Sequence, residues 1–154
     1  MEAVLASLIA VAGTLLGAII TFAVQRRTST QAEVFAHAQQ LRQDRLTTYG
    51  AYAGAVTALK QGIVALWFRL QDAPDSHETR QAFRECDQLG AATENARFRV
   101  RLLAHDLMLV ALADAAFDAV GPIRTASNRT ELAEREQDLQ TALNAFITAA
   151  AQIR

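Results

Sequence analysis

The sequence predicts an all-α protein with one N-terminal transmembrane helix, followed by a long antiparallel helical hairpin or three-helix bundle. Three observations predict it. The 154 residues are 51% hydrophobic but include only 7 glycines and 2 prolines, and the commonest residues are strong helix formers. An uncharged run occupies the N-terminus, and apolar residues recur at heptad spacing through the three segments that follow. The length suits one modest domain plus a short extra element.

The uncharged run spans residues 4–24. At 1.5 Å per residue, about 20 helical residues cross a hydrocarbon core of roughly 30 Å. Glu2 precedes the run, and Arg26 and Arg27 follow it. A secretory signal has its positive charge before the apolar stretch, so we predict an uncleaved membrane anchor. The positive-inside rule places Arg26 and Arg27 in the cytoplasm, the short N-terminus outside, and the rest of the chain inside the cell.

Small residues mark one face of this run. Gly13 and Gly17 have the GxxxG spacing that lets two membrane helices approach closely. Ala6 and Ala10 extend the same stripe by two turns. We therefore expect the anchor to pair with another helix and the protein to be a homo-oligomer.

Two sequence features punctuate the remainder. Pro74, within "DAPDSHE", ends one helix, and Gly121-Pro122 ends the next. Capping-box spacing marks helix starts at two pairs, which are Asp75 with Glu78 and Asn128 with Glu131. The predicted domains are an anchor at 1–27 and a cytoplasmic bundle at 28–154, with helices at about 30–71, 77–120 and 129–153.

Four charged residues interrupt the apolar seams. They form a candidate polar layer that would fix the register of the helices: Arg42, Arg45, Asp114 and Glu136. The alternative is that each charge lies at the edge of its seam and is solvated, since isolated surface pairs contribute little.

The segment "IVALWFRL", residues 63–70, is apolar on more than one helix face. The third helix is too short to reach the end of the hairpin, so this tip is expected to be only two helices thick. An uncovered apolar surface there is a candidate partner interface, formed by Ile63, Val64, Trp67 and Phe68. The alternative is that Trp67 and Phe68 fold over the hairpin end and close it.

No motif indicates catalysis. His37, His77 and His105 are far apart in the sequence and lack a metal-binding spacing, and the single cysteine, Cys86, is expected to be a buried structural thiol. We therefore predict no enzyme, no cofactor or metal, and no small-molecule substrate. The net charge of −1 argues against a nucleic-acid partner.

Three stretches, "GTLLGAIITFAVQRR", "RLTTYGAYAGAVTAL" and "ALWFRLQDAPDS", together resemble small uncharacterised single-pass membrane proteins of high-GC Gram-positive bacteria. The resemblance implies an anchor plus cytoplasmic helices with a coiled-coil-like character. It implies no functional residues.

These features predict a membrane-anchored helical interaction or scaffold protein. Its expected partners are the lipid bilayer, a second copy of itself, and another membrane or cytoplasmic protein. The first alternative is an accessory subunit of a membrane machine for secretion, DNA transfer or defence. The second is a holin-like membrane-disrupting protein, against which the long ordered bundle argues.

Overall fold

The computed structural model describes residue 37 and residues 39–152. The chain divides into two compact units, Met1–Arg42 and Gln43–Arg154. Every regular element in the described residues is a helix, which confirms the all-α prediction. In this part of the chain no helix is both long and apolar enough to cross a membrane. The predicted transmembrane run, residues 4–24, lies outside the described residues.

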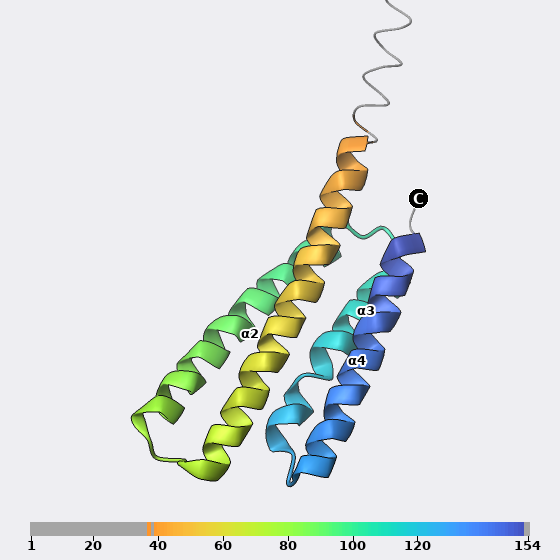
Figure 1. Ribbon diagram of the computed structural model, residues 1–154. Coiled ribbons are helices and arrows are strands. Elements are labelled where there is room, and N and C mark those ends of the chain that lie inside the picture. The colour runs from red at the N-terminus through yellow and green to blue at the C-terminus, as the bar shows by residue number, and fades with distance from the viewer. Residues whose placement is uncertain (1–36, 38, 153–154) are drawn as a thin grey trace, which may run out of the picture. The chain divides into compact units, whose positions relative to one another are not determined.

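The second unit is a bundle of antiparallel helices (Figure 1). The first helix covers residues 39–72 and contributes residues 43–72 to this unit. The other elements, in order, are α2 at His77–Leu103, α3 at Leu107–Asp118, the 3₁₀ helix η1 at Gly121–Thr125, and α4 at Arg129–Gln152. The predicted three-helix arrangement is therefore wrong in one respect, because the segment expected to be a single helix at 77–120 forms two.

The break between α2 and α3 has a local cause. Ala104 leaves the helical conformation, and its N–H bonds back to the carbonyl of Val100 at 2.8 Å. Asp106 then caps α3, because its carboxylate accepts the N–H of Met108 at 2.8 Å. A side-chain oxygen that accepts a first-turn N–H satisfies one of the donors that a helix start leaves without a partner. Capping-box spacing does not mark Asp106, because Leu109 rather than Glu or Gln stands three residues later, and no glycine or proline marks the end of α2.

The two predicted helix starts had different outcomes. Asn128 Oδ1 accepts the N–H of Glu131 at 2.9 Å, which confirms that cap. The predicted Asp75 cap is wrong, because Ser76 Oγ accepts the N–H of Thr79 instead. Ser76 also donates to the Thr79 hydroxyl, which in turn donates to the carbonyl of Ala73. These bonds hold the turn at Pro74 in place.

The apolar seams form the core. Tyr52 of the first helix is fully buried, and its ring meets the edge of Phe146 of α4 at a centroid distance of 5.0 Å. Its hydroxyl donates to the carbonyl of Ala113 in α3 at 2.5 Å. Burial raises the pKa of this phenol well above its usual value. The other fully buried large side chains are Val56, Leu66, Thr79, Thr93, Val100, Leu109, Ile123 and Leu139.

Replacement of Tyr52 by Phe is expected to lower the free energy of unfolding by about 1 kcal/mol, because it removes a buried hydrogen bond but keeps the ring. Tyr49→Phe is the matched control. The Tyr49 hydroxyl is buried and has no hydrogen-bond partner among the described residues, so its removal should leave stability unchanged or raise it. Urea unfolding followed by circular dichroism measures both variants. Equal losses would contradict a stabilising role for the Tyr52 hydroxyl.

Candidate functional site

The four residues of the predicted polar layer do not meet. Asp114 binds Arg101, with both carboxylate oxygens 2.8 Å from Nη2, and lies 3.8 Å from Arg97. Glu136 pairs with Lys60 at 3.9 Å. Arg45 Nη2 donates to His105 Nδ1 at 3.1 Å, and Arg42 is exposed. The prediction that these four charged side chains form one layer is therefore wrong.

The break at 104–106 explains the different pairing. A continuous 77–120 helix would have carried Asp114 along the axis of α2 and away from Arg101. Because α3 folds back as a separate helix, Asp114 lies beside the last turns of α2. There Arg97 stacks over the Phe117 ring at 4.2 Å, a cation–π contact that supports the same pairing.

The predicted tip interface is largely covered by the chain itself. Ile63 and Trp67 are buried, and Trp67 Nε1 donates to the carbonyl of Ala126 at 2.7 Å. Val64 is half-buried, while Phe68 is 39% exposed with the guanidinium of Arg129 5.5 Å from its ring centroid. The expectation of an uncovered tip is wrong because the segment around η1, leading into α4, reaches the end of the hairpin. Contact with a partner through Val64 and Phe68 stays a prediction.

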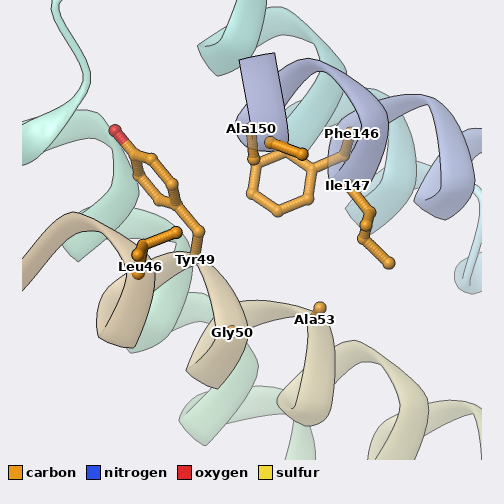
Figure 2. A pocket seen from close by; sticks show the side chains of 8 residues that line it. Leu46, Tyr49, Gly50, Ala53, Phe146, Ile147 and Ala150 are labelled. Carbon is orange, nitrogen blue, oxygen red and sulfur yellow. The ribbon is translucent and has the colours of Figure 1, made fainter. Parts of the chain in front are cut away.

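An apolar groove lies between the first helix and the C-terminal half of α4 (Figure 2). Its volume is about 290 Å³. Tyr49 and Phe146 lie at its floor, with their rings edge to face at 6.1 Å. Ile147, at its edge, is 45% exposed. The full lining consists of Leu46, Tyr49, Gly50, Ala53, Phe146, Ile147, Ala150 and Ala151.

This groove was not predicted, although the spacing of three of its lining residues in the sequence is consistent with it. Leu46, Gly50 and Ala53 share one helix face because they are spaced by four and three residues. That face lies beside the heptad seam rather than on it, so a search for heptads passed over it. Gly50 has no internal packing reason in the described residues, since a Cβ there would meet nothing within 4 Å.

Cys86 is buried, and burial raises the pKa of its thiol, as expected for a structural cysteine. No group of three or more metal-ligating side chains occurs within residues 37 and 39–152. The predicted membrane-helix residues lie outside the described residues: Ala6, Ala10, Gly13, Gly17, Arg26 and Arg27.

Replacement of Gly50 by Ala is expected to raise the free energy of unfolding by roughly 0.5–1 kcal/mol, because alanine suits a helix interior better and the added methyl is unobstructed. Gly62→Ala is the comparison. Its Cβ would lie 2.8 Å from Leu89 Cδ1, so Leu89 must move and the gain should be smaller. Thermal unfolding measures both variants. A Gly50→Ala variant less stable than the parent would show that the groove is packed more closely than described.

Comparison with known proteins gives one match. Residues 46–153 match the family described as KilB plasmid transfer protein. No curated protein and no solved structure matches the chain. The matched segment includes α2, α3, η1, α4, most of the first helix and every residue that lines the groove. Since it covers well over half of the sequence, the chain belongs to the KilB plasmid transfer protein family.

Proposed function

We propose that this protein is an accessory protein of plasmid DNA transfer, acting as a membrane-anchored helical scaffold without catalytic activity. The family match over residues 46–153 carries this proposal. It favours DNA transfer among the membrane machines that the sequence analysis considered. The matched residues are those of the helical bundle, so the bundle is the part of the chain expected to perform the family's role.

A scaffold role is favoured because several charged side chains of the described residues form ion pairs within the bundle. Asp114 pairs with Arg101, Glu136 with Lys60, and Glu131 with Arg135. A catalytic site needs polar groups that converge on a space a substrate can enter. The groove is instead lined by apolar side chains and small residues, a surface suited to burial against another apolar surface.

Residues 4–24 supply the proposed anchor. The run is uncharged, and Arg26 and Arg27 follow it. The proposed topology is a single span with the N-terminus outside and the bundle on the cytoplasmic face. A cytoplasmic bundle would meet the plasmid's transfer proteins on the side of the membrane where the DNA lies.

Deletion of residues 4–24 is expected to move the protein from the membrane fraction to the soluble fraction. Plasmid transfer frequency should then fall to the level seen without the gene. The control restores the span with an unrelated apolar helix that keeps Arg26 and Arg27, and it should return the protein to the membrane. Unchanged transfer after loss of the whole gene would refute the proposed function.

Pairing of the anchors is a separable part of the proposal. The double variant Gly13→Ile and Gly17→Ile is expected to lose self-association in a membrane two-hybrid reporter, because bulky side chains prevent close backbone approach. A matched variant with Ile at Val11 and Leu15, outside the GxxxG pair, should keep it. Self-association that survives the glycine changes would reduce residues 4–24 to a plain anchor.

A further inference from the structure

Three exposed apolar side chains flank the link between α2 and α3. Leu102, Leu107 and Met108 are 83%, 84% and 64% exposed, the largest exposed fractions among the large hydrophobic residues described. We call these three residues the bend surface. Their neighbours Leu103 and Leu109 turn inward, half-buried and buried respectively. The exposure is therefore specific to one side of the bend.

The capped break creates this exposure. In a continuous helix, Leu107 and Met108 would follow Leu102 by about one and a half turns and spread around the axis. Asp106 caps the start of a new helix by accepting the N–H of Met108. The end of α2 and the start of α3 are therefore joined by the short link at 104–106. Large apolar side chains exposed in this way need a reason, because water penalises them.

The bend surface lies at the end of the unit where the chain enters. Arg45, two residues after the unit begins at Gln43, donates to His105 within the link. The C-terminal end of α4 lies at this same end of the bundle (Figure 1). In the sequence, the uncharged run at 4–24 precedes the residues that form this end of the bundle. Residues 25–38 separate the run from the helix that begins at residue 39, and a chain segment of this length spans at most about 50 Å.

The size and shape of the bend surface favour a bilayer over a protein as its partner. A stable protein interface buries about 800 Å² on each side, and three side chains on a short link supply only part of that. A bilayer needs no complementary shape, and apolar side chains enter its headgroup boundary to a depth of roughly 5–10 Å. Arg99 is exposed about one turn before Leu102, and Arg45 of the first helix contacts His105 in the link. Guanidinium groups suit lipid phosphates.

We propose that the bend surface, Leu102, Leu107 and Met108, inserts into the headgroup region of the bilayer that holds the anchor. This proposal rests on the proposed function, since it assumes that residues 4–24 hold the chain at a membrane. A second contact would fix how the bundle lies on the bilayer. It would hold the turn at 73–76 away from the lipid, because Arg45 and Asp72 are separated by about 40 Å of helix.

The test places a polarity-sensitive fluorophore on the full-length chain in vesicles containing anionic lipid. The probe variant is Leu107→Cys with Cys86→Ala, and the matched control is Asp75→Cys with Cys86→Ala, in the exposed distal turn. Recovery with floated vesicles is measured first, and quenching by lipids that carry a spin label at the upper acyl chain second. Circular dichroism verifies that both labelled variants keep their helical content.

The proposal predicts that both variants float with vesicles, that emission from position 107 is blue-shifted and loses most of its intensity to the quencher, and that emission from position 75 is unaffected. Quenching no stronger at 107 than at 75 would overturn it. A blue shift at 107 without lipid quenching would also overturn it, in favour of burial against a second copy of the chain. Failure of both variants to float would instead refute the anchor, and the bend contact with it.

Discussion

The position of Tyr52 is the constraint on which the bundle depends. Through this one side chain the first helix contacts two other helices. The Tyr52 ring meets Phe146 of α4 edge to face, and its hydroxyl donates to the carbonyl of Ala113 in α3. The hydrogen bond requires α3 to pack against the first helix, and the ring contact requires α4 to do so. Its neighbour Tyr49 forms the floor of the groove with the same Phe146. The packing that builds the core therefore also fixes the candidate surface.

The break at 104–106 bears on both the ion pairs of the bundle and its exposed apolar side chains. It separates α2 from α3, and Asp114 then faces Arg101 and Arg97 rather than the first helix. It also produces the exposed bend at Leu102, Leu107 and Met108. The break, capped by the Asp106 carboxylate, thus lies beside both an ion pair and an exposed apolar surface. The segment that matches the KilB plasmid transfer protein family includes the whole of this arrangement.

Heptad spacing predicted the seam because period is a local property that the sequence displays directly. The seam residues Tyr52, Leu66 and Leu139 are all buried. Pairing between helices was not predictable to the same degree. Asp106 caps a helix that was not expected, and Asp114 therefore has other partners than predicted. Trp67 is buried because the segment around η1 lies over it and the Ala126 carbonyl accepts its N–H. The groove beside Gly50 depends on where the first helix and α4 move apart. That separation depends on tertiary packing, which a single sequence does not show. Residues 4–24 remain a sequence prediction.

We propose that this helical bundle works on the cytoplasmic side of a membrane, and the side from which an exposed cysteine can be labelled checks that topology. In cells that carry the plasmid, a Cys86→Ala, Asp75→Cys chain can be exposed to a membrane-impermeant maleimide. If the proposed topology is right, the chain is recovered in the membrane fraction and reacts only after the cells are permeabilised. Reaction in intact cells, or recovery of the chain in the soluble fraction, would contradict it.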